Sequence, residues 1–146
     1  MPQYVIPSGQ VLTTGDFLES VIRKVMSPGV VAISEHASLD HAYNAIVAHR
    51  IHAVLVVSAS AAEPLGWATA RGMLSYADKD RSILTARDAI TEEPRTIGVR
   101  ATVRDAIDDL TVTGATHLLV VEDETSFPIG VVSDLDLAAF LGHRSG

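Results

Sequence analysis

Ser133 and Asp136 are the two residues of this sequence whose types and spacing best suit ligand binding. They follow Gly130 and stand three positions apart, so on a helix they lie about one turn apart and face the same side. An ionised carboxylate accepts two hydroxyl protons at once, and the free N–H groups of a helix N-terminus attract a phosphate. The same pair equally suits a structural role, with Ser133 as an N-cap and Asp136 as a first-turn acid.

Few other residue patterns suit catalysis or metal binding. The sequence contains no cysteine, which excludes disulfides, thiolate nucleophiles and cysteine-bound zinc. It also lacks the motifs G-x-x-x-x-G-K-[ST], G-x-G-x-x-G, G-x-S-x-G and H-E-x-x-H. Histidines cluster at positions 36, 41, 49 and 52, but His41 and His49 lie roughly 12 Å apart along one predicted helix. We therefore expect neither an enzyme nor a metal site.

The composition indicates a folded protein that binds neither nucleic acid nor membranes. Of the 146 residues, 47% are apolar and 20% are charged, which is typical of a globular domain. The net charge of −7 opposes the many phosphate contacts that nonspecific nucleic-acid binding needs. No apolar run approaches the ~20 residues that cross a bilayer, and no secretory signal is visible. We expect a cytoplasmic protein.

The chain contains an internal repeat with a period of about 64 residues. Turn-forming and small residues match as well as apolar ones, which makes chance a weak explanation. The matched pairs include Ile33 with Ile97, Ala42 with Ala106, Pro64 with Pro128, Gly66 with Gly130, and Thr69 with Ser133. His52 matches His117 after a one-residue shift. Asp136 matches Gly72, so the first copy lacks the carboxylate.

Each copy is predicted to form a strand, a helix, two strands and a second helix, which makes the fold mixed α+β. β-branched runs predict strands at 30–33, 53–57, 95–99 and 118–121, and further strands begin at Pro64 and Pro128. Apolar residues at helical spacing predict helices at 39–46, 73–77, 103–110 and 135–141. Ser38 and Thr102 are suited to cap two of these helices, and Asp105 completes a capping box.

Segments that precede each copy are expected to form leading helices. Leu18, Val21, Ile22 and Val25 form an apolar stripe after Asp16, a suitable N-cap, and Thr85 begins the corresponding helix before the second copy. We expect a loose arm over 1–13, the leading helix and first motif over 14–82, and the second motif over 83–146.

The element order, the period and the run Gly130-Val131-Val132-Ser133-Asp134-Leu135-Asp136 resemble the tandem CBS-domain family, also called the Bateman module. The resemblance covers residues 14 to 142, and it implies two βαββα units related by a pseudo-two-fold axis, with a leading helix. In nucleotide-binding members the hydroxyl and the aspartate sit at the last strand-to-helix turn and hold the ribose. The resemblance therefore places Ser133 and Asp136 at a ribose.

The resemblance also implies the rest of a ligand site. It places these residues against the base and in the cleft: Val31, Ile51, His52, Gly130, Val131 and Val132. It places His117 and Arg71 near the phosphates. Two departures matter: Ala53 and Leu118 replace an arginine that is frequent after the histidines, and Gly72 removes the ribose acceptor of the first copy. Packing at the seam between the two units is the structural alternative for the cleft residues.

Two functions follow as hypotheses from the resemblance. The first is a regulatory module without catalysis or a required cofactor, which binds an adenosine ligand (AMP, ADP, ATP, NAD or S-adenosylmethionine) and signals to an unknown partner protein. The second is a ligand-silent scaffold for dimerisation or docking. The family also implies a homodimer, and the small residues Ala138 and Ala139 would allow close helix approach.

Overall fold

Two sheets with matching strand order carry the two repeats in the computed structural model, which describes residues 18–142. In each sheet, a parallel pair of strands is extended by an antiparallel third strand. The first sheet contains β2 (Ala32–Ser34), β3 (Ala53–Val57) and β4 (Pro64–Thr69). The second contains β5 (Thr96–Gly98), β6 (His117–Val121), β7 (Pro128–Ser133) and, at its edge, β1 (Ser27–Pro28). The mixed α+β fold with two repeats is confirmed.

Helices begin where the sequence places hydroxyl caps. Helix α2 (Leu39–His49) begins after Ser38, whose side chain accepts a hydrogen bond from the His41 N–H. Helix α4 (Val103–Thr113) begins after Thr102, and Asp105 closes the predicted capping box. The second helix of each unit starts earlier than expected, directly after its strand. These are α3 (Ala70–Met73), followed by the 3-10 turn η2 (Leu74–Tyr76), and α5 (Asp134–Gly142).

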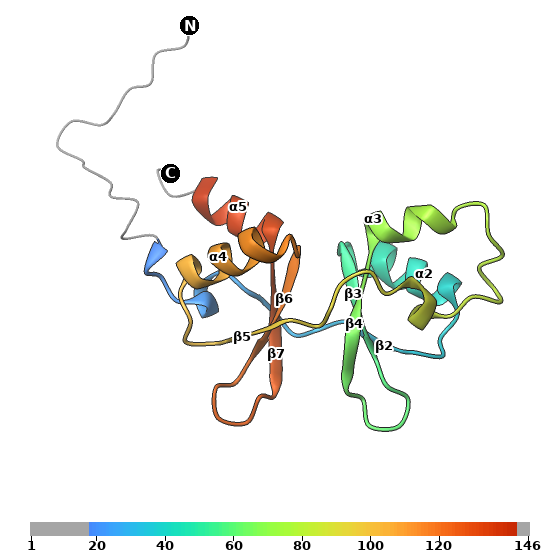
Figure 1. Cartoon of the computed structure of the whole chain (residues 1–146), viewed down its shortest axis with the longest axis horizontal. Helices are drawn as coiled ribbons and strands as arrows, with labels where there is room; N and C mark the ends of the chain where they lie inside the picture. The colour runs from blue at the N-terminus through green and yellow to red at the C-terminus, as the bar shows by residue number, and fades with distance from the viewer. Residues whose placement is uncertain (1–17, 143–146) are drawn as a thin grey trace, which may run out of the picture.

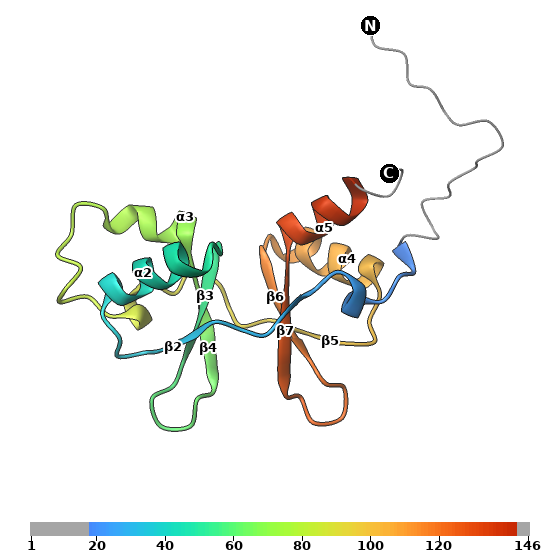
Figure 2. The ribbon, with the colours of Figure 1, turned by 180° about the vertical axis from the view of Figure 1, so that it is seen from behind.

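The helices of both units lie toward one end of the molecule, and the β3–β4 and β6–β7 turns lie at the other end (Figures 1 and 2). Successive side chains of a strand point to opposite faces of the sheet, so the buried side chains of one strand belong to two different clusters. Val54 and Val56 face the core of the first unit, whereas Leu55 joins a third cluster with Trp67 and Leu119. This third cluster takes side chains from both sheets and joins the units. None of the helices within residues 18–142 has the length and apolar character needed to cross a bilayer.

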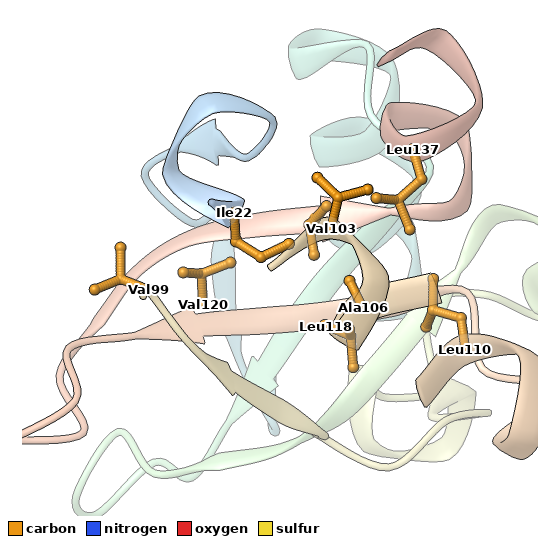
Figure 3. Close-up of a cluster of buried hydrophobic side chains, with 9 residues drawn as sticks. Ile22, Val99, Val103, Ala106, Leu110, Leu118, Val120 and Leu137 are labelled. Atoms are coloured by element: carbon orange, nitrogen blue, oxygen red, sulfur yellow. The ribbon is translucent and has the colours of Figure 1, made fainter. Parts of the chain in front are cut away.

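Each leading segment packs on the opposite unit. Ile22 is fully buried in the core of the second unit, beside Val103 and Val120 (Figure 3). The Ile22 N–H donates to the Ala101 carbonyl, and β1 pairs with β7. Conversely, the 3-10 turn η3 (Ala86–Ala89) packs in the core of the first unit. The units are therefore interlocked through their leading segments.

The leading segment differs from the helix that its apolar spacing predicts. Within residues 18–142 its helical part is essentially the 3-10 turn η1 (Ile22–Lys24). Val21 adopts an extended conformation and forms an isolated antiparallel bridge with Thr102, so pairing with the second unit replaces helical hydrogen bonds. The proposed cap Asp16 and the expected arm over 1–13 lie outside the described residues.

We expect Ile22→Ala to destabilise the second unit more than the first. Removing a fully buried isoleucine side chain costs about 2–5 kcal/mol of unfolding free energy. Amide hydrogen exchange should therefore accelerate in β6 and α4 before it does in β3 and α2. Val21→Ala is the matched control, because the Val21 side chain is 38% exposed. Faster exchange confined to the first unit would contradict the interlocked packing.

Candidate ligand-binding cleft

A cavity of about 380 Å³ lies at the seam between the two units. One wall is formed by β1, by the residues that follow it, and by the residues that precede β3. The other comes from the start of β6 and the junction of β7 with α5. The lining residues include Ser27, Val30, Val31, Ile51, His52, Trp67, His117, Val131, Ser133 and Asp136. The volume lies in the range of small-molecule sites, ~300–1,000 Å³.

The cleft brings together most of the residues that the sequence singled out. Val31, Ile51 and His52 reach it from the first half of the chain. The second half contributes Val131, Ser133, Asp136 and His117. Residues far apart in sequence therefore meet at one site, because β1 crosses to the edge of the second sheet.

Three residues expected at the ligand lie elsewhere. Val132 is fully buried in the core of the second unit, since it points to the opposite face of β7 from Val131. A Cβ at Gly130 would lie 2.6 Å from the Ser27 carbonyl oxygen, so this glycine is needed for β1 to pair with β7. Arg71 is exposed on α3 and does not line the cleft.

Ser133 and Asp136 cap helix α5 and line the cleft at the same time. The Ser133 hydroxyl accepts a hydrogen bond from the Asp136 N–H at 3.1 Å, and Asp136 Oδ2 accepts one from the Ser133 N–H at 2.9 Å. This reciprocal pair is the structural role that the sequence left open. It uses one carboxylate oxygen, and no group within residues 18–142 bonds Oδ1. The half-buried carboxylate therefore keeps one acceptor for a ligand.

His117 is a buried polar residue of the cleft wall. Its Nδ1 lies 2.8 Å from the Thr116 hydroxyl, and its ring centroid lies 5.3 Å from that of Trp67. Burial lowers the pKa of His117, because it penalises the charged imidazolium, although the carboxylates of Glu92, Asp134 and Asp136 act in the opposite direction. The imidazole is therefore neutral at pH 7. Phosphate binding by a charged His117 does not fit this environment.

Arg50 and Trp67 are among the lining residues that the sequence did not predict as site residues. Arg50 ends helix α2 in the left-handed conformation (φ 53°, ψ 48°), where the second unit has Gly114. A non-glycine residue costs about 1–2 kcal/mol there, and the substitution places a guanidinium at the cleft. An arginine at a position that the repeat fills with glycine was the available signal. Trp67 is also in the wall, and its buried Nε1 has no hydrogen-bond partner in the described part of the chain.

In the other half of the seam, Thr91 fills the place that corresponds to the Asp136 side chain. A Cβ at Gly72 would lie 2.5 Å from Thr91 Cγ2 and 2.9 Å from Thr69 Oγ1. Glu92 accepts hydrogen bonds from the Thr116 N–H at 2.9 Å and the Thr116 hydroxyl at 2.5 Å. Gly72 therefore does more than remove the acceptor that Asp136 provides in the second unit. Its lack of a side chain also leaves space for Thr91. No group of three His, Asp or Glu side chains within residues 18–142 is placed to hold a metal ion.

Comparisons with known proteins agree with this architecture. The family model of the CBS domain matches residues 22–79 and again residues 86–143. No curated protein matches the chain. The chain is similar in fold to the CBS domain of a bacterial CNNM/CorC family Mg²⁺ transporter in complex with ATP (TM-score 0.75, 22% identity, 87% of this chain and 90% of that one). It is also similar to a CBS domain protein from Pyrobaculum aerophilum complexed with AMP (TM-score 0.72, 18% identity, 83% of this chain and 95% of that one).

We expect Gly72→Ala to lower the unfolding free energy by about 1–3 kcal/mol, because the new methyl group meets Thr91 and the capping hydroxyl of Thr69. Gly142→Ala is the control, since a Cβ at this helical glycine meets nothing within 4 Å. There, alanine should be neutral or stabilising by up to about 1 kcal/mol. Equal effects of the two substitutions in thermal unfolding would contradict the close packing at Gly72.

Proposed function

Because the chain belongs to the CBS-domain family and carries two copies of the domain, we propose that it binds an adenosine ligand in the cleft between its units and signals to a partner protein. CBS pairs are typically regulatory, non-catalytic modules. One observation carries the proposal: a cavity of about 380 Å³ collects Val31, Ile51 and Asp136 from both halves of the chain. The candidate ligands are AMP, ADP, ATP, NAD and S-adenosylmethionine.

The chemistry of the cleft suits the parts of a nucleoside. Asp136 Oδ1 is an acceptor for the ribose hydroxyls, beside the Ser133 hydroxyl. The apolar side chains of Val31 and Ile51 suit a flat base. Arg50 supplies a permanent positive charge for a phosphate, and the exposed His52, two positions further along the chain, also lines the cleft. Two structures of similar fold hold ATP and AMP, which supports an adenine nucleotide here.

The proposal that the protein signals rests on the two walls of the cleft, which come from different units. Val31 and Ile51 come from one half of the chain and Asp136 from the other, so a ligand contacts both units at once. A ligand shifts a conformational equilibrium only by its difference in affinity for the two states. A ligand that bridges the seam favours the arrangement in which both walls meet it. The regulated partner would recognise that arrangement.

A ligand-silent scaffold is the second candidate, and the reciprocal cap between Ser133 and Asp136 favours it. This cap gives both residues a structural purpose without any ligand. In that case the cleft is a packing seam, and the fold serves dimerisation or docking alone.

We expect AMP to raise the unfolding temperature of the protein. At one hundred times its dissociation constant, a ligand adds about 2.7 kcal/mol of stability. Asp136→Asn should weaken AMP binding by at least about tenfold, because asparagine keeps an acceptor oxygen for the Ser133 N–H but loses the charge that strengthens hydrogen bonds to a ribose. Thermal unfolding and titration calorimetry measure both effects.

The matched control is Asp134→Asn, on an exposed residue in the same first turn of α5 that does not line the cleft. It should leave AMP binding unchanged. If none of the five adenosine ligands binds, the scaffold hypothesis replaces the proposed function. Equal binding losses in the two variants would mean that helix capping, and not ribose contact, explains the effect.

We further propose a homodimer formed through the helices. Apolar side chains are exposed on them, namely Val47 (75%), Leu74 (69%) and Val112 (85%), and the helices of both units lie toward the same end of the molecule (Figure 1). Large apolar side chains that are exposed on helices at the same end of the molecule are candidates for contact with a second copy of the chain.

Combined Val47→Glu and Val112→Glu substitutions should convert a dimer to a monomer in sedimentation velocity. Phe127→Glu is the control, because this 61% exposed side chain lies in the turn between β6 and β7 at the opposite end. A wild-type monomer, or a dimer that only Phe127→Glu disrupts, would overturn this assignment.

A further inference from the structure

A chain of hydrogen bonds runs from the filled half of the seam to the open cleft. Glu92 Oε2 accepts a hydrogen bond from the Thr116 hydroxyl at 2.5 Å, and Glu92 Oε1 accepts one from the Thr116 N–H at 2.9 Å. The Thr116 hydroxyl in turn lies 2.8 Å from His117 Nδ1. Glu92 belongs to the segment that pairs with Trp67 of the first unit, so the chain links both units.

The direction of these hydrogen bonds determines the tautomer of His117. A hydroxyl has a single proton, and Thr116 donates it to Glu92, whose ionised carboxylate can only accept. The contact between Thr116 and His117 therefore requires His117 Nδ1–H to donate to the Thr116 oxygen. Since a neutral imidazole carries one N–H, Nε2 is left with a lone pair.

His117 Nε2 is available to a ligand. It has no hydrogen-bond partner within residues 18–142. It is also not sealed from solvent, because Trp67 Nε1 is the one side-chain polar atom of the described residues that is both buried and unpartnered. His117 is also one of the residues that line the cleft.

The position of His117 places this acceptor beside the sugar-binding residues. His117 on β6 is the antiparallel partner of Ser133 on β7, and the Cβ atoms of such partners stand about 5 Å apart on the same face of the sheet. Ser133 and Asp136 exchange two hydrogen bonds, and the Oδ1 atom of Asp136 is the other free acceptor. Two acceptors close together suit a ligand group with two donors, such as a vicinal diol, and they repel phosphate oxygens.

We propose that His117 Nε2 accepts a hydrogen bond from a sugar hydroxyl of the ligand, and that Glu92 and Thr116 hold it in this acceptor state. The inference rests on the proposed function, and it replaces the expectation that His117 contacts phosphate. The first unit provides an internal comparison. There, Ile51 stands where Thr116 stands in the second unit, so His52 has no hydroxyl next to it to hold its tautomer.

The first experiment uses the ligand-free protein. Nitrogen-15 NMR of the histidine rings at pH 7 should show His117 as the neutral Nδ1–H tautomer. Thr116→Val should allow the Nε2–H tautomer to appear, because valine removes the hydroxyl that accepts from Nδ1. Thr111→Val on the exposed face of α4 is the control, and it should leave the His117 signals unchanged. A wild-type His117 that is charged, or protonated on Nε2, overturns the proposal.

The second experiment compares AMP with its 2′-deoxy and 3′-deoxy analogues and with inosine 5′-monophosphate in the wild type and in His117→Phe. In the wild type, loss of the contacting hydroxyl should weaken binding about five- to tenfold. In His117→Phe, which keeps a ring against Trp67, the same deoxy analogue should bind about as well as AMP. Thermal unfolding shows that each variant is folded.

The outcomes separate the two claims. If AMP does not bind at all, the proposed function fails, and the tautomer measurement still decides the state of His117. If AMP binds but both deoxy analogues lose the same factor in wild type and variant, the sugar contact is refuted while nucleotide binding stands. If only inosine 5′-monophosphate shows a loss that depends on His117, the acceptor serves the 6-amino group of the base, and the sugar assignment is wrong.

Discussion

The pairing of β1 with β7 is the contact on which the cleft depends. Ser27 and Pro28 leave the first half of the chain and form the edge of the second sheet, where Gly130 gives their backbone room. This crossing carries Val31 over the seam toward Ser133 and Asp136. The bridge between Trp67 and Glu92 performs the reciprocal crossing. Each unit is thus completed by a segment of the other, and the site exists only when both are folded together.

Two copies of one backbone motif have become unequal through a few side chains. In one half, Asp136 and Ser133 line an open cavity, whereas in the other Gly72 leaves space for Thr91. Glu92 provides the carboxylate of the filled half, but it bonds Thr116 of the protein itself. Because the Thr116 hydroxyl contacts His117, the hydrogen bonds of the filled half also determine which nitrogen of this cleft residue is free to accept. In this asymmetric arrangement, residues of the filled half therefore position a residue of the open cleft.

The seam combines a buried apolar cluster with a cleft of mixed chemistry. Leu55, Trp67 and Leu119 join the two sheets through buried apolar contacts, so a shift between the units disturbs a close-packed cluster. Next to this cluster, the cleft wall contains both acceptors and a cation. Asp136 and His117 offer lone pairs, and Arg50 offers positive charge. A wall of this composition suits a ligand that carries both hydroxyls and a phosphate.

Local interactions are what the sequence determined by itself. The repeat, the buried strand at 53–57 and the caps at Ser38 and Thr102 follow from periodicity and from hydrogen bonds between near neighbours. Tertiary structure decided the rest. The leading segment forms a 3-10 turn in place of the predicted helix because Val21 pairs with Thr102 and Ile22 is buried in the opposite unit. Arg50 becomes a cleft residue, and His117 becomes an acceptor through Thr116 and Glu92. These outcomes depend on contacts between segments far apart in the chain, which spacing along a sequence does not encode.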